Sequence, residues 1–148
     1  EDWCSRTGMS RTILERLPKF KKSILRELTE GTGKVTGSKQ LARAYKARDP
    51  LAREVVREAA ELLGIAIANW VTVLALDTVI IGGGVAEALG EPLVRDITRS
   101  FRKHVFPASN QDCKLVLTKL TDDAGLLGAA LLARQHVASQ AVRSKRSA

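Results

Sequence analysis

The sequence has few aromatic residues and few cysteines, and both shortages narrow the possible structures. Aromatic residues make up 4% of the 148 positions, which argues against a fold dominated by β-sheet, because aromatic and β-branched residues favour strands. Alanine, leucine and arginine are abundant instead, and they favour helices. Cys4 and Cys113 are the only two cysteines, so we expect no disulfide framework and no cysteine-based metal motif. His104 and His136 complete no metal motif either.

Hydrophobic runs long enough to cross a membrane are also missing. The uncharged run 62–76 falls short of the roughly 20 residues that span a bilayer. We interpret this run as a buried core helix, in which Asn69 must find hydrogen-bond partners. Because no signal pattern opens the chain, we expect a cytoplasmic protein with no membrane partner. The first residues, EDWCSRTG, look cut from a longer chain, so we also expect a larger parent protein.

Acidic residues are missing from the C-terminal end. None follows Asp123, and four basic residues near the end carry half of the net charge of +8: Arg134, Arg143, Lys145 and Arg146. A positive net charge can indicate a nucleic-acid-binding domain. This alternative rests here on charge alone. Because this end has no aromatic residue on which bases could stack, a solvated, flexible basic tail over 138–148 is favoured.

The remaining pattern alternates helices with short strands. Asp49 followed by Pro50 predicts the start of a long helix, since Asp caps the first turn and Pro has no amide to lose there. Other predicted helices cover 20–30, 92–105 and a segment from Asp122 or Asp123 to about Gln135, with strands at 78–81 and 114–120. This alternation is typical of an α/β layer.

Two glycine-rich segments were candidates for ligand binding. The segment 31–39 lacks the spacing of a phosphate-binding P-loop, so it predicts a polar loop. Gly82, Gly83 and Gly84 directly follow the first strand, where the backbone can approach a ligand closely. Glu87 excludes the dinucleotide-binding fingerprint there. A nucleotide site and a plain strand-to-helix turn both remain open readings of this triple glycine.

Four ordered motifs carry a family resemblance. They are DPLA at 49–52, LGIAIAN at 63–69, VIIGGGVAE at 79–87 and DDAGLLGAALLA at 122–133. In this order they resemble the C-terminal half of the ROK family (repressor, open reading frame, kinase), which comprises bacterial sugar kinases and sugar-responsive repressors. The resemblance implies a helix-rich α/β fold, the C-terminal lobe of an actin-like ATPase (ribonuclease H-like) fold, over 1–137.

The resemblance also implies functional residues. Gly82, Gly83, Gly84 and Val85 would form the adenosine wall of a nucleotide site. Glu1, separated from Ser5 by three residues in the pattern Glu-x-x-x-Ser, would match a sugar-binding glutamate, although Arg6 stands where the family often has glycine. No catalytic residue or metal ligand is expected in this chain.

The resemblance implies an ATP-dependent hexose kinase that uses Mg²⁺, with the zinc site of the family upstream of this chain. Sugar and ATP would be its partners, and family members are commonly homo-oligomers. The alternative is the sugar-sensing region of a ROK repressor, whose upstream helix-turn-helix would bind nucleic acid. The sequence alone does not identify which sugar the protein would bind.

The basic tail generates a first test. Residues 138–148 offer too little apolar surface to offset the entropy of ordering them. We therefore expect their amides to exchange with solvent without protection in a hydrogen-exchange measurement. Strong protection in this segment, relative to the amides of 62–76 as an internal control, would contradict a flexible tail.

Overall fold

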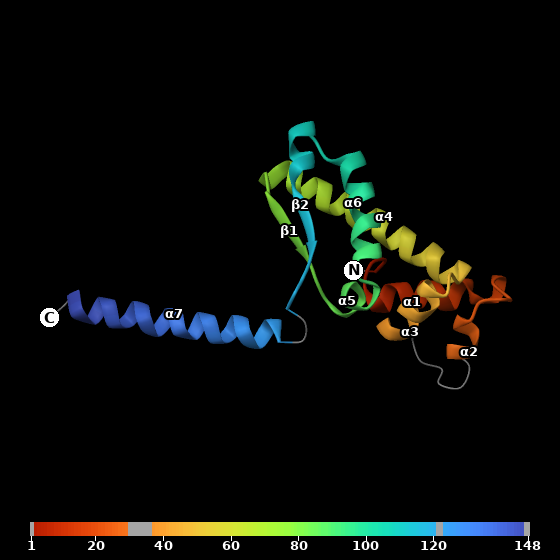
Figure 1. Ribbon diagram of the computed structural model, residues 1–148, viewed down its shortest axis with the longest axis horizontal. Coiled ribbons are helices and arrows are strands. Elements are labelled where there is room, and N and C mark those ends of the chain that lie inside the picture. The colour runs from red at the N-terminus through yellow and green to blue at the C-terminus, as the bar shows by residue number, and fades with distance from the viewer. Residues whose placement is uncertain (1, 30–36, 121–122, 147–148) are drawn as a thin grey trace. The chain divides into compact units, whose positions relative to one another are not determined.

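The computed structural model describes residues 2–29, 37–120 and 123–146, which form two compact units, Glu1–Thr118 and Lys119–Ala148 (Figure 1). The first unit holds six helices in its described part, together with two short 3₁₀ turns. The helices are α1 (Arg6–Arg16), α2 (Leu25–Thr29), α3 (Ser38–Lys46), α4 (Pro50–Leu74), α5 (Gly84–Leu89) and α6 (Glu91–His104). Two strands, β1 (Thr78–Ile81) and β2 (Lys114–Leu117), complete it, and the second unit holds α7 (Ala124–Arg146).

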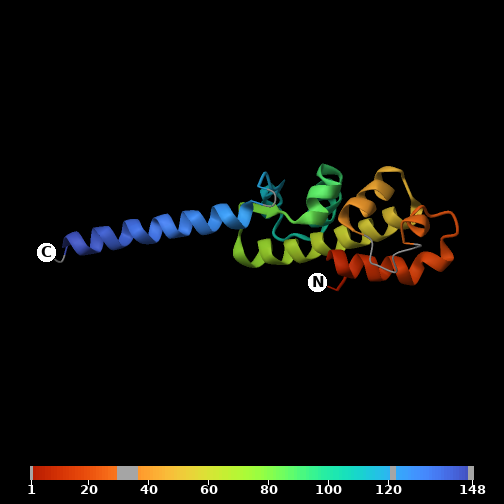
Figure 2. The same cartoon turned by 90° about the horizontal axis from the view of Figure 1, so that it is seen from below.

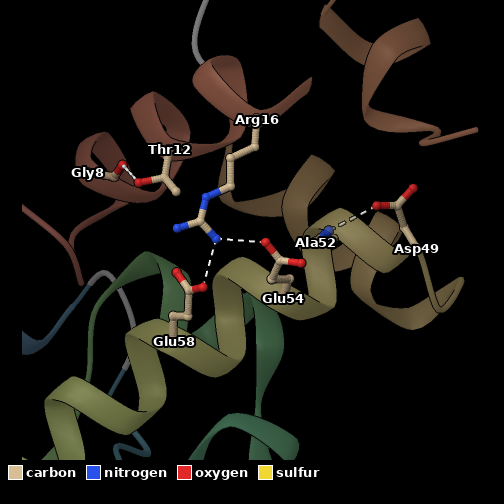
Figure 3. A network of polar contacts seen from close by, with 7 residues as sticks. All are labelled: Gly8, Thr12, Arg16, Asp49, Ala52, Glu54 and Glu58. Atoms are coloured by element: carbon tan, nitrogen blue, oxygen red, sulfur yellow. Dashed lines mark hydrogen bonds and ion pairs between the residues drawn. The ribbon is translucent and has the colours of Figure 1, made fainter. Parts of the chain in front are cut away.

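Asp49 fixes the start of α4, as the sequence predicted. Its carboxylate is almost fully buried and accepts a hydrogen bond from the amide of Ala52 at 2.9 Å (Figure 3). The same carboxylate accepts from the amide of Ile24 at 2.8 Å and from the Ser23 hydroxyl at 3.1 Å. Since these contacts hold residues 23 and 24 outside a helix, the predicted helix over 20–30 is shorter than expected, and α2 begins only at Leu25.

Helix α4 packs against α6 at very short range. The two helices are in contact, and α6 crosses α4 in the view of Figure 1. A Cβ added at Gly64 on α4 would stand 2.5 Å from Ser100 Cβ and 2.7 Å from the Ile97 carbonyl oxygen of α6. The Ser100 hydroxyl in turn donates a hydrogen bond to the Glu61 carbonyl at 2.7 Å. Only glycine permits this approach, so Gly64 sets the spacing of the two helices.

The prediction that 62–76 forms a uniformly buried helix is wrong for one face. Helix α1 lies along the N-terminal half of α4 (Figure 2) and covers one side of it there. In the C-terminal half, Asn69 is exposed, and Trp70 and Val73 are 58% and 80% exposed. Asn69 therefore needs no buried partner. None of the described helices is long and apolar enough to cross a membrane.

Arg16 joins α1 to α4 through a forked ion pair. Its Nη1 lies 2.8 Å from Glu54 Oε1 and 2.7 Å from Glu58 Oε1 (Figure 3). The hydrogen bond with Glu58 is the main reason that the pKa of Arg16 is raised above its ordinary value. All three side chains are partly exposed, so the pair adds modest stability and chiefly orients α1.

The two strands form a parallel sheet in which Thr78 pairs with Lys114 and Ile81 with Leu117. Val79, Ile81, Leu115 and Leu117 pack toward the core, while Ile80 on the opposite face is 69% exposed. Helix α6 provides the crossover between the strands, as the predicted order of strand, helix and strand requires. The short helix α5, directly after β1, was not predicted.

Two further helix boundaries differ from the sequence prediction. Helix α3 begins at Ser38, inside the segment 31–39 expected to be a loop, of which 31–36 lie outside the described residues. Helix α7 continues to Arg146 rather than ending near Gln135, since no glycine or proline interrupts 136–146 and most of these residues tolerate a helix. Flexibility of 138–148 stays a prediction.

The contact at Gly64 generates the second test. Gly64→Ala should lower the free energy of unfolding by about 1–3 kcal/mol, the usual cost of overpacking a tight core, as measured by urea denaturation. Asn69→Ala, on the exposed face of the same helix, is the matched control and should leave stability within roughly 0.5 kcal/mol. Equal stability of the two variants would mean that α4 and α6 separate without cost.

Candidate functional site

A cavity of about 350 Å³ lies where the three glycines meet two other segments of the first unit. We call Gly82–Gly84 the glycine loop and the space beside it the glycine-loop cavity. Three chain segments line it: Cys4, Ser5 and Arg6 from the N-terminal side, Ser38 at the start of α3, and Gly82, Gly83, Gly84 and Val85. The four residues predicted for the nucleotide wall thus lie together at one cavity.

The three glycines stand in different surroundings. A Cβ at Gly82 would lie 3.2 Å from Cγ2 of Thr118, which leaves little room for a side chain. Gly83 has φ +97°, a backbone conformation that favours glycine. At Gly84 the nearest atom to an added Cβ is the Ser38 hydroxyl oxygen at 3.6 Å, an ordinary contact. Neither the backbone nor the packing of the described residues therefore requires glycine at position 84.

The N-terminal side of the cavity is held by hydrogen bonds of the fold. Ser5 caps α1, where its hydroxyl oxygen accepts from the Gly8 amide at 3.0 Å. Gly8 is required because a side chain there would collide with the Asp2 carbonyl. The Cys4 thiol donates to the Ala59 carbonyl of α4 at 3.4 Å. The side chains of Cys4 and Ser5 are thereby engaged in positioning the cavity wall.

These groups do not form a catalytic centre. Burial raises the pKa of Cys4 above its ordinary value, which keeps the thiol protonated and weakly nucleophilic. None of the cavity-lining residues is acidic, so the described wall holds no carboxylate base. The described ranges of the chain also contain no group of three or more His, Cys, Asp or Glu residues that could hold a metal ion. The described lining thus offers backbone, hydroxyl and guanidinium groups to a ligand but no carboxylate.

Ser38 reaches the cavity because α3 packs on α5. It is the first residue of α3, after Gly37, whose amide donates to Gln40 Oε1 at 2.6 Å. Ser38 lies in the segment predicted as a loop and had no predicted role, since nothing in the sequence signals that it lies beside Gly84. Arg6 was noted only as a departure from the family pattern. Glu1, the predicted sugar contact, lies outside the described residues.

Comparison with known proteins identifies the family. A sequence model described as the ROK family matches residues 1–136. The chain belongs to the ROK family. Among curated relatives, the glucokinase of Halalkalibacterium halodurans is 33% identical over 136 residues, which make up 92% of this chain and 41% of the relative. This ROK chain thus spans about two-fifths of the length of the curated relatives it matches.

Solved structures of ROK proteins resemble the chain in fold. A ROK family glucokinase from Streptomyces griseus, solved with glucose and AMPPNP, has a TM-score of 0.77 at 30% identity, over 91% of this chain and 44% of that one. A ROK family transcriptional regulator, a homologue of the E. coli MLC protein, has a TM-score of 0.71 at 27% identity, over 86% of this chain and 31% of that one. The predicted fold class, the helix-rich α/β C-terminal lobe of an actin-like ATPase fold, is confirmed.

Proposed function

We propose that this chain is part of an ATP-dependent sugar kinase of the ROK family and that Gly82–Val85 form the wall against which the adenosine packs. The observation that carries the proposal concerns Gly84. This residue lines the cavity, yet the described fold does not require glycine at its position. The absence of a side chain leaves room for another molecule to approach the backbone closely. Similarity to glucokinases supports a sugar as the second substrate.

The division of labour follows from what the described residues offer. In the intact kinase, the γ-phosphoryl group of ATP passes to a sugar hydroxyl, and positioning supplies much of the rate acceleration. The glycine-loop cavity contributes binding and orientation of the nucleotide. Its protonated Cys4 and hydroxyl groups offer no general base, so deprotonation of the sugar belongs to a part of the protein other than this cavity. Glu1 would add a hydrogen bond to the sugar.

Metal ions belong to the same wider proposal. ATP kinases use Mg²⁺ to neutralise phosphate charge, and the family resemblance implies a zinc site upstream. The described residues provide no cluster of ligands for either ion, so we assign neither to them. We further propose that 1–137 form one ROK lobe followed by the tail 138–148, in a cytoplasmic homo-oligomer.

A second candidate is the sugar-sensing region of a ROK repressor, favoured by the likeness to a ROK transcriptional regulator. In that case an upstream domain would bind nucleic acid, and the cavity would need no ATP. Tight ATP binding by the full-length protein therefore separates the two candidates.

Gly84→Val tests the nucleotide wall. Because position 84 has no positive φ and has room for a Cβ, the variant should keep its stability within roughly 0.5 kcal/mol. Its side chain should fill the space of the ligand and weaken ATP binding by about tenfold or more, as overpacking typically does. Isothermal titration of the full-length protein measures the affinity.

Gly83→Val is the matched comparison for this experiment. Its backbone at φ +97° makes a β-branched residue strained, at a cost of about 1–3 kcal/mol of stability. A folded Gly84→Val variant that binds ATP as tightly as the parent would leave the glycine loop as a structural turn and refute the proposed wall.

The division of labour gives a further test with the chain alone. We expect no ATP-dependent phosphorylation of hexoses by the purified 148-residue chain, because loss of a general base and its partners lowers rates by several orders of magnitude. A coupled assay with glucose measures this, with the full-length protein as positive control. Turnover by the chain alone would place the catalytic groups within it.

A further inference from the structure

Four polar side chains line the glycine-loop cavity, and they differ in whether the fold already uses them. The Cys4 thiol donates to the Ala59 carbonyl, and the Ser5 hydroxyl oxygen accepts from the Gly8 amide. Arg6 and Ser38 have no side-chain hydrogen bond or ion pair within the described part of the chain. The two donors left for a ligand are therefore a guanidinium and a hydroxyl.

Arg6 brings a positive charge that the local fold does not explain. It is the first residue of α1, whose first turn contains no acidic residue, and a cation at a helix N-terminus is unfavourable because it opposes the helix dipole. Arg11 on the same helix instead pairs with Asp2, at 3.6 Å. Arg6 is exposed to solvent, and the cavity lining offers it no carboxylate, so within the cavity its guanidinium has no acidic partner.

Ser38 lines the same cavity from the start of α3. Its hydroxyl oxygen lies 3.6 Å from the position of a Cβ at Gly84, and the residue is half-buried. A ligand packed against the bare backbone of Gly84 would thus lie within reach of the Ser38 hydroxyl. Arg6 lines the same cavity, so a molecule bound there would have both donors in its surroundings.

We propose that Arg6 and Ser38 bind a phosphate group of the nucleotide held by the glycine loop. A guanidinium can only donate hydrogen bonds, and it matches the paired oxygens of a phosphate, while a serine hydroxyl donates to a third oxygen. The ligand class is a nucleoside phosphate, in preference to an uncharged nucleoside or a free sugar. This inference rests on the proposed function, in which the glycine loop binds a nucleotide.

The test compares adenosine, AMP and ATP on the full-length protein by isothermal titration. Arg6→Ala should weaken binding of AMP and ATP about tenfold, the loss expected for a charge-assisted hydrogen bond, and leave adenosine affinity within about twofold. Arg6→Lys keeps the charge and should recover part of the loss. Ser38→Ala should weaken both phosphorylated ligands by about threefold to tenfold.

Arg95→Ala is the matched control, since Arg95 is an exposed arginine of α6 that does not line this cavity. It removes the same charge and should change no affinity beyond about twofold. An equal loss for Arg6→Ala and Arg95→Ala would reduce the effect to net charge and overturn the inference. So would Arg6→Ala weakening adenosine as much as ATP, or weakening neither.

Gly84→Val separates this inference from the function on which it rests. If Gly84→Val weakens all three ligands and Arg6→Ala weakens none, the nucleotide wall stands and the phosphate contact is wrong. When both variants bind ATP as tightly as the parent, the nucleotide site itself is wrong. Loss of ATP and AMP affinity in Arg6→Ala, with adenosine binding kept and an unchanged unfolding transition, supports the phosphate contact.

Discussion

Helices α4 and α6 approach each other at Gly64, and most of the first unit is arranged around this contact. Because Ser100 and Ile97 occupy the space of the missing side chain, α6 lies close enough to cover the buried face of α4 and to carry the chain from β1 to β2. Strand β2 then packs on α6, and the inner residues of both strands join the core. The end of β1, and with it the glycine loop, takes its position from this spacing.

The other walls of the cavity depend on polar contacts made by α4. Cys4 attaches the N-terminal segment to the Ala59 carbonyl, and the Arg16 fork orients α1 above Glu54 and Glu58. Asp49 organises the N-terminal end of α4 by holding Ser23 and Ile24. A single long helix thereby supports groups that are distant in the sequence but adjacent at the glycine-loop cavity.

The sequence was most informative where local chemistry decides the structure. Asp49 before Pro50 predicted the start of α4 to the residue, and the β-branched segment before Gly82 predicted β1, since capping and strand propensity act over a few positions. Burial and convergence depend on distant contacts. Asn69 was wrongly placed in the core because α1 covers only part of α4, and the meeting of Ser38 with Gly84 depends on how α3 packs on α5. The family motifs identified the glycine loop but carried no signal for Arg6 or Ser38.

The structural constraints on the three glycines differ, and this difference affects which of them can be replaced during evolution of the lobe. A side chain at Gly82 would crowd Thr118, and one at Gly83 would be strained by the positive φ, so the fold itself favours glycine at both positions. Gly84 escapes this constraint. Under the proposed function, selection on the nucleotide would preserve it, so a descendant that no longer binds the nucleotide but keeps the fold could lose the third glycine first.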